Sequence, residues 1–308
     1  MDSIISLSNI LKQNTFNEKE FNRFIKTKGT QGFILHQKNM GNEINIETIK
    51  KELNKVIVDE SYQDRYDFYL IKRNIKKIHE DIKYIKENGE LIVNKALKEI
   101  YKIVPKDMKI STNIYLYIGG TDGGFTINRR KVFINYGKYI GQSEELIKIL
   151  SHELYHSRHL SLKNRLILMF KMISKTNRFI YESIGKSIEE GIACLVQHGS
   201  FLKKDDPIGT LTRRNIVFIK DELDLLNNIL LNIKNDQLRY KDIRKLNIYV
   251  IGYHIVRTVY NNEGVFVLDD WTVNLEYRKI MRKYVEICKK KDLISGFTKE
   301  IEEWINLG

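Results

Sequence analysis

Apolar residues between residues 62 and 104 recur at the spacing of one helical face. Five isoleucines follow one another at alternating intervals of four and three residues: Ile71, Ile75, Ile78, Ile82 and Ile85. This period is typical of a buried helical stripe. The segment KENGE at residues 86–90 interrupts it, and a second helical stretch follows from about residue 90 to residue 104. The pattern predicts core helices in the N-terminal part of the chain.

After residue 110 the pattern changes to short runs rich in Tyr, Phe, Ile and Val, separated by clusters of Gly, Asp and Asn. Alternation with period two predicts three strands, near residues 112–118, 124–128 and 131–136. We expect them to form a small antiparallel sheet. Ser143 is a suitable N-cap for the next helix, because Glu144 and Glu145 follow in the first turn, where the helix dipole favours acids.

Helical periodicity then continues in five stretches: residues 163–175, 178–203, 211–234, 241–261 and 271–290. We therefore predict a mostly helical α+β protein with a small sheet just before the helix that begins at Ser143. An N-terminal helical region would span residues 1–108, and a second domain would span residues 109–308.

Composition excludes several classes of protein. The 52 basic and 39 acidic residues give a formal charge of +13, but the basic residues are spread over the helices, and none of the basic stretches carries interleaved aromatics for stacking single strands. We expect a solvated surface and no nucleic-acid partner. Cys194 and Cys288 are the only cysteines, which excludes a disulfide framework. The N-terminus lacks signal-peptide features, and the apolar run RLILMFKMI is too short to span a bilayer. We expect a soluble, cytoplasmic protein.

Residues 149–158, ILSHELYHSR, contain a His-Glu-x-x-His pattern. On a helix His152 and His156 project from the same face, one turn apart, so their imidazoles can occupy two positions of a zinc tetrahedron. Glu153 is rotated by about 100° from His152 and can reach a metal-bound water rather than the metal. This is the arrangement of zinc peptidases, in which the glutamate is the general base.

A zinc site of this kind needs a third protein ligand. Leu162 stands where the metzincin pattern requires a third histidine, so that class is excluded. Further along, SIEEGIACLVQHG contains Glu190 and Gly191 in a Glu-Gly-x-Ala pattern. We predict Glu190 as the third ligand, with the glycine allowing close approach to the motif helix. Glu189 and His159 remain the alternatives.

These motifs resemble those of the gluzincin metallopeptidases. Gluzincin aminopeptidases carry Glu-Gly-x-Ala after His-Glu-x-x-His, followed by a Tyr-x-Lys-Gly element whose tyrosine stabilises the oxyanion. Residues 249–252, YVIG, match the tyrosine and the glycine, but Ile251 replaces the lysine. The order GGTDGGF, HELYH, EEGIA and YVIGYHIV is similar to that of uncharacterised bacterial families of predicted zinc-dependent proteases, over roughly residues 110–260.

The resemblance implies a thermolysin-like, gluzincin-type catalytic core in residues 109–308, with one Zn²⁺ ion and an oxyanion role for Tyr249. Tyr253, one turn away, is a rival for that role and His254 is a weaker one, while helix packing is the alternative for both tyrosines. No Gly-x-Met-Glu-Asn segment is present to anchor a substrate amine. The choice between aminopeptidase and endopeptidase therefore stays open.

We predict zinc-dependent hydrolysis of peptide bonds, with a peptide or protein as the substrate. The strand just before the motif helix is expected to form an edge to which an extended peptide adds. Gly123, Gly124 and Phe125 would contact this peptide, although the glycines could instead form tight turns. The alternatives are a catalytically silent metal-binding or regulatory protein on the same fold and a basic helical nucleic-acid-binding protein.

Overall fold

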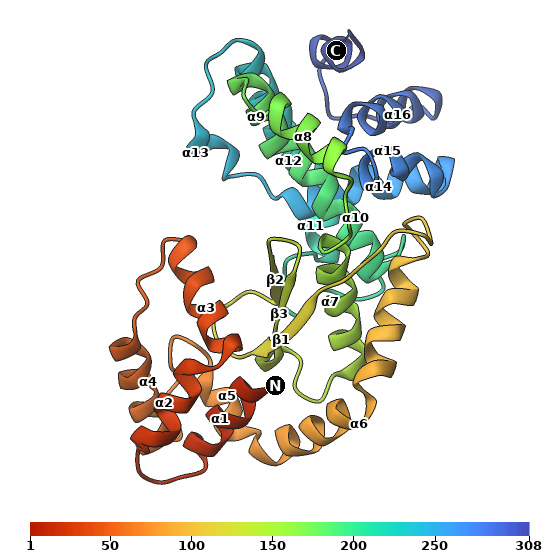
Figure 1. The fold of residues 1–308 in the computed structure, drawn as a ribbon. Coiled ribbons are helices and arrows are strands. Elements are labelled where there is room, and N and C mark those ends of the chain that lie inside the picture. The colour runs from red at the N-terminus through yellow and green to blue at the C-terminus, as the bar shows by residue number, and fades with distance from the viewer. Residues whose placement is uncertain (308) are drawn as a thin grey trace. The chain divides into compact units, whose positions relative to one another are not determined.

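The computed structural model describes residues 1–307, and Figure 1 shows its helices and strands. These residues form two compact units. The first combines Met1–Lys98 with Ile110–Ser157, and the second combines Glu99–Lys109 with the chain from Arg158 onward. Helices predominate in both units and the strands lie in the first. The prediction of a mostly helical α+β protein is therefore confirmed.

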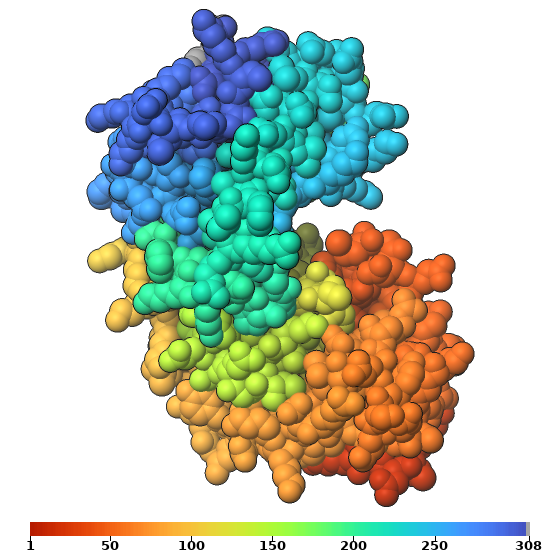
Figure 2. All heavy atoms as spheres, turned by 180° about the vertical axis from the view of Figure 1, so that it is seen from behind, coloured from red at the N-terminus to blue at the C-terminus, as the bar shows by residue number. Residues whose placement is uncertain are grey.

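Six helices precede the sheet: α1 (Asp2–Leu11), α2 (Glu18–Lys26), α3 (Lys28–Asn39), α4 (Ile46–Val58), α5 (Phe68–Arg73) and α6 (Ile75–Ile100). The side chains of Asn17, Thr27 and Asn45 each accept a hydrogen bond from a backbone amide three residues further on, at the starts of α2, α3 and α4. These caps satisfy amides that have no partner inside the helix. Figure 2 shows the red and orange side chains of this region as one continuous surface.

The predicted interruption at residues 86–90 is confirmed as a kink within α6. Asn88 has φ −119° and ψ 15°, outside the helical region, and its side-chain amide donates to the carbonyl of Tyr84. The isoleucine stripe is divided differently from the prediction, because Asn74 ends α5 and places Ile71 on that shorter helix.

The three strands lie where the sequence predicts them: β1 (Asn113–Tyr117), β2 (Gly124–Ile127) and β3 (Lys131–Asn135). The order is β1-β3-β2, with β2 antiparallel to β3 and β1 parallel to it. The prediction of a fully antiparallel sheet is therefore wrong. Asn128 and Arg129 both have positive φ and form the tight turn that makes β2 and β3 a hairpin. The loop at residues 118–123 carries the chain past β3, so that β1 pairs with the side of β3 opposite to β2.

This order also corrects the prediction about the sheet edge. The strand just before the motif helix is β3, and it lies in the centre of the sheet. The edges are β1 and β2. Because Gly124 and Phe125 lie on β2, the residues predicted to contact a substrate do lie on an edge strand, but not on the strand from which the prediction started.

Helix α7 (Ser143–His156) follows the sheet and packs against β2 and β3. Glu144 and Glu145 lie in its first turn as predicted. The N-cap is Gln142 rather than Ser143, and its side chain makes no capping hydrogen bond. The start of α7 is instead fixed by Asp81 of α6, whose carboxylate accepts from the Gly141 amide at 2.7 Å.

The second unit is built from ten α-helices among the described residues: α8 (Leu162–Lys171), α9 (Lys175–Ile180), α10 (Lys186–His198), α11 (Arg213–Val217), α12 (Ile219–Lys234), α13 (Tyr240–Ile243), α14 (Ile248–Glu263), α15 (Asp269–Thr272), α16 (Tyr277–Lys290) and α17 (Lys299–Leu307). The stretch predicted as one helix at residues 178–203 is divided, because a π-helical turn at Tyr181–Gly185 separates α9 from α10. No helix within residues 1–307 is both long enough and apolar enough to cross a membrane.

Helices α10 and α14 pack closely against each other in the second unit. A Cβ atom added to Gly191 would lie 2.2 Å from the backbone of Gly252, and one added to Gly252 would lie 1.7 Å from the carbonyl oxygen of Ser187. Only glycine fits at both positions. We predicted that Gly191 admits the motif helix, whereas the approach that the structure shows is to α14.

We predict that Gly252→Ala lowers the free energy of unfolding by about 3 kcal/mol or more, because its methyl group cannot fit without separating α10 from α14. Urea unfolding followed by circular dichroism measures this loss. Gly89→Ala is the matched control, since Gly89 lies in α6 with no atom near its added Cβ. This change should raise the free energy of unfolding or alter it by less than about 1 kcal/mol. Equal midpoints for the two variants would contradict the prediction.

Candidate metal centre

Helix α7 presents the two motif histidines one turn apart, as the sequence predicts. The ring centroids of His152 and His156 are 5.1 Å apart. His152 and Glu153 are buried, and His156 is partly exposed at the end of the helix. The packing of α7 against β2 and β3 holds the motif against the sheet.

Glu153 lies directly over the edge strand β2. The hydroxyl of Thr126 donates to Glu153 Oε2 at 2.9 Å and lies 3.0 Å from the Glu153 carbonyl oxygen. A Cβ atom at Gly124 would lie 2.9 Å from Glu153 Cγ and 3.2 Å from Oε1. The missing side chain of Gly124 therefore makes room for the carboxylate, and Thr126 fixes one of its oxygens.

The β2–β3 turn also stabilises the end of the motif helix. Arg129, in the left-handed region with φ 58°, donates from Nη1 to the carbonyl of His156 at 3.1 Å. A guanidinium at this position satisfies a terminal carbonyl and interacts favourably with the negative end of the helix dipole.

Asn135 organises the glycine-rich loop that leads into β2. Its buried side-chain amide donates to the carbonyls of Gly119, Gly120 and Asp122 at 2.9–3.2 Å. Its backbone amide donates to the carbonyl of Gly123 at 2.9 Å. The loop is thus held to the central strand, and Gly123 enters β2 in a fixed position.

Phe125 lies in an aromatic stack rather than projecting freely from the edge strand. Its ring stacks on His36 of α3, with centroids 3.9 Å apart, and on Phe133 of β3 at 4.8 Å. His36 Nε2 also lies 3.2 Å from the carboxylate of Asp122. A contact between Phe125 and a substrate stays a prediction.

In the second unit, two adjacent glutamates of α10 have different roles. Glu189 forms a bidentate ion pair with Arg158, with both N–O distances 2.7 Å, and accepts from the indole of Trp271 at 2.6 Å. Arg158 is fully buried and also donates from Nε to the carbonyl of Thr272. A buried guanidinium requires such compensation. Both carboxylate oxygens of Glu189 are thereby engaged in structural contacts.

Glu190 is the carboxylate that the structure groups with the motif histidines. One ligand atom each from His152, His156 and Glu190 lies within 4.8 Å of the other two. No other group of this kind is found among residues 1–307. Two imidazoles and one carboxylate are the donors of many catalytic zinc sites, which keep a fourth position for water. The donor set therefore fits zinc.

The two tyrosines predicted on α14 differ in their surroundings. Tyr253 is fully buried among Cys194, Leu202, Leu211 and Val250, and its hydroxyl donates to the carbonyl of Gly199 at 2.8 Å. Burial raises the pKa of this tyrosine to about 12. Its environment is that of a packing residue.

Tyr249 is only partly buried at the border of that cluster, which favours it over Tyr253 for a role at the site. His254, the weaker rival, is within hydrogen-bond distance of the Tyr284 hydroxyl at 3.2 Å. Burial lowers the pKa of His254 to about 4, so this histidine is neutral at physiological pH and belongs to the interior of the second unit.

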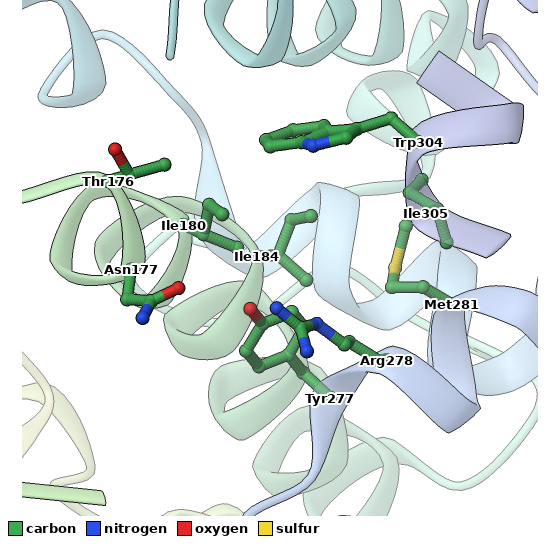
Figure 3. A pocket seen from close by; sticks show the side chains of 9 residues that line it. All are labelled: Thr176, Asn177, Ile180, Ile184, Tyr277, Arg278, Met281, Trp304 and Ile305. Carbon is green, nitrogen blue, oxygen red and sulfur yellow. The ribbon is translucent and has the colours of Figure 1, made fainter. Parts of the chain in front are cut away.

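Figure 3 shows another pocket of the second unit, with a volume of about 160 Å³. Trp304 of α17 covers it on one side, and Tyr277 and Arg278 of α16 lie opposite. Its lining contains no histidine, cysteine or carboxylate, and none of the predicted site residues. It therefore offers neither a metal ligand nor a general base.

A His-Glu-x-x-His pattern on a helix, together with a grouped carboxylate, is typical of zinc-dependent hydrolases. The model of a family described as "Putative zinc dependent peptidase (DUF5700)" matches residues 21–293, which is most of the chain. The chain belongs to this family. The predicted zinc metallopeptidase family and the predicted zinc cofactor are thereby confirmed. Neither the curated proteins nor the solved structures gave a match.

Several residues that shape the candidate site carry little sequence signal. Thr126 and Asn135 are ordinary strand residues, and their partners are distant in sequence. Arg158 is the exception, because a basic residue stands there where zinc-peptidase helices usually carry a hydrophobic one. That departure could have indicated a buried ion pair, although not its partner Glu189.

Proposed function

We propose that the chain is a gluzincin-type zinc peptidase in which His152, His156 and Glu190 hold one zinc ion. The observation that carries this proposal is the grouping of their three ligand atoms within 4.8 Å in a chain of a zinc-dependent peptidase family. The catalytic domain would span residues 109–308, and the substrate would be a peptide or protein.

Zinc in such a site lowers the pKa of a bound water and polarises the carbonyl of the scissile bond. Glu153 would accept the proton of such a water and later deliver it to the leaving amine. The Thr126 hydroxyl donates to Oε2 and so holds the carboxylate in position. The bare Cα of Gly124 keeps space beside Oε1, and a side chain there would displace the general base.

The substrate adds as an extended strand to the free edge of β2. Gly124 supplies the pairing groups and Gly123 and Phe125 flank it, because the Gly123 carbonyl accepts from the Asn135 amide of β3 and backbone groups alternate in direction along an antiparallel strand. Peptides commonly add to exposed sheet edges. Asn135 and the stack on Phe125 hold this strand in place before the substrate arrives. Such preorganisation lowers the entropic cost of binding.

Tyr249 donates its hydroxyl to the oxyanion that develops at the scissile carbonyl. Two observations support the choice: the Tyr253 hydroxyl already donates to Gly199, whereas Tyr249 lies at the border of the buried cluster. A donor placed before the reaction stabilises the transition state more than a donor that must reorient.

Metal analysis tests the ligand set. Wild-type protein should contain close to one zinc per chain, and Glu190→Gln should bind zinc at least about tenfold more weakly, because a neutral amide is a poor zinc ligand. Glu189→Gln is the matched control. It should keep its zinc but lose about 3–5 kcal/mol of stability, since Arg158 is left buried and unpaired. If Glu189→Gln lost its zinc while Glu190→Gln kept it, Glu189 would be the ligand.

Turnover of a peptide library tests the general base. Glu153→Gln should retain zinc, while kcat falls by about 10²–10⁴-fold. Thr126→Val, which leaves the carboxylate in place without its hydrogen bond, should lower kcat by only about tenfold. Undiminished turnover in zinc-loaded Glu153→Gln would reject this role. A wild type that binds zinc and cleaves no peptide would indicate the catalytically silent alternative.

The two tyrosines form a matched pair for the oxyanion role. Tyr249→Phe should lower kcat by about 10²-fold with little change in KM, because the lost hydrogen bond exists only in the transition state. Tyr253→Phe should change kcat little and cost about 1 kcal/mol of stability, since the Gly199 carbonyl loses its donor. Steady-state kinetics with thermal melting of both variants decides between them, and the reverse pattern would assign the role to Tyr253.

A further inference from the structure

Helix α8 has no buried residue, although six of its ten residues are apolar. A helix on the surface of a globular protein normally buries its apolar side. The apolar residues of this segment are instead among the most exposed of the chain: Leu162 is 67%, Leu166 40%, Met169 56%, Phe170 63% and Ile173 77% exposed. An exposed apolar patch of this kind marks an interaction surface.

Polar contacts hold α8 to the rest of the second unit. The side-chain amide of Asn164 donates to the carbonyl of Val273 at 2.8 Å, and the ammonium group of Lys171 lies 3.0 Å from the carboxylate of Glu276. Asn164 and Lys171 are seven residues apart and therefore share one face of the helix. These polar contacts attach the helix on a face that also carries the half-buried Leu168.

The opposite face carries the apolar stripe. Leu162, Leu166 and Met169 follow one another at intervals of four and three residues, which places them on one side of the helix. Leu166 in this stripe lies about 160° around the helix axis from Asn164. Phe170 borders this stripe, and Ile173 continues it past the end of α8. The helix is thus attached through polar contacts, and its apolar stripe faces outward.

The charges around the stripe are of one sign. Residues 159–181 contain five basic residues and no Asp or Glu. The basic residues are all exposed: Lys163, Arg165, Lys171, Lys175 and Arg178. Lys163 and Arg165 lie about 100° and 60° from Leu162 on opposite sides, so they flank the stripe. Two of the five also pair with carboxylates of the second unit, Lys171 with Glu276 and Lys175 with Asp236.

We propose that α8 is an interfacial helix that binds the surface of an anionic lipid bilayer. An outward apolar stripe of Leu, Met, Phe and Ile with flanking Lys and Arg is the pattern of helices that lie in the headgroup region. The basic flanks supply attraction to anionic headgroups. The proposal concerns attachment to a membrane surface and is independent of the zinc site.

Charge argues for lipid over a second copy of the chain as the occupant. In a two-fold contact each stripe would face the other, and the uniformly basic segments of both copies would then repel one another. A bilayer containing anionic lipid instead offers apolar tails beneath a layer of negative charge. The apolar stripe matches the lipid tails, and the basic flanks match the layer of negative charge.

Co-sedimentation of the full chain with vesicles tests the proposal. Wild type should bind vesicles of phosphatidylcholine mixed equally with phosphatidylglycerol, and it should bind phosphatidylcholine alone at least about tenfold more weakly. Phe170→Glu should lower binding to the mixed vesicles by about tenfold or more, because a charge replaces an inserted ring. Lys163→Gln should lower it about fivefold, and added salt should weaken it further.

Val58→Glu is the matched control, because Val58 is 84% exposed on α4 and receives the same change of charge. It should bind vesicles like the wild type. The Phe170→Glu variant loses no buried contact, so its circular dichroism spectrum should be unchanged.

Failure of the wild type to bind the mixed vesicles would overturn the proposal, as would undiminished binding by Phe170→Glu. A lipid-free dimer that Phe170→Glu converts to monomers would assign the stripe to a second copy of the chain instead. Because vesicle binding is measured without substrate or turnover, these outcomes are distinct from any failure of the peptidase proposal.

Discussion

The crossing of α10 and α14 is the constraint on which the second unit depends. At Gly191 and Gly252 the two backbones are so close that no side chain fits between them. The residues proposed for chemistry stand beside these glycines, since Glu190 precedes Gly191 and Tyr249 lies one turn before Gly252. A packing requirement and a chemical requirement therefore occupy the same short segments. This crossing explains the glycine of the Glu-Gly-x-Ala pattern, because the glycine fixes the position of the helix that carries the carboxylate.

The two adjacent glutamates on α10 have different roles, one structural and one proposed as a metal ligand. Neighbouring residues on a helix point about 100° apart, so Glu189 and Glu190 reach different surroundings. Glu189 compensates the buried charge of Arg158 and accepts from Trp271, whereas Glu190 groups with the motif histidines. A carboxylate engaged on both oxygens by a buried guanidinium is poorly available to a metal. The ion pair that stabilises the second unit therefore also distinguishes the two acids.

In the first unit the sheet positions Glu153. Three contacts converge on the motif helix from the β2–β3 hairpin: Gly124 makes room, Thr126 donates a hydrogen bond, and Arg129 satisfies the carbonyl at the helix end. All three come from a segment of six residues, so one hairpin positions the end of α7. Helix α8 differs from α7, because polar contacts attach it and its apolar stripe faces outward.

The sequence by itself determined what depends on local spacing. Histidines four apart, a glutamate before a glycine, three runs of period two and a break at Asn88 are properties of neighbouring residues, and the elements, the zinc class and the ligand types followed from them. Tertiary structure decided what depends on partners distant along the chain. The parallel pairing of β1, the carboxylate that compensates Arg158 and the hydrogen bond of Tyr253 to Gly199 all join residues at least 18 positions apart. Periodicity identifies which face of a helix is apolar, but only packing shows whether that face is covered, and for α8 the structure leaves it exposed.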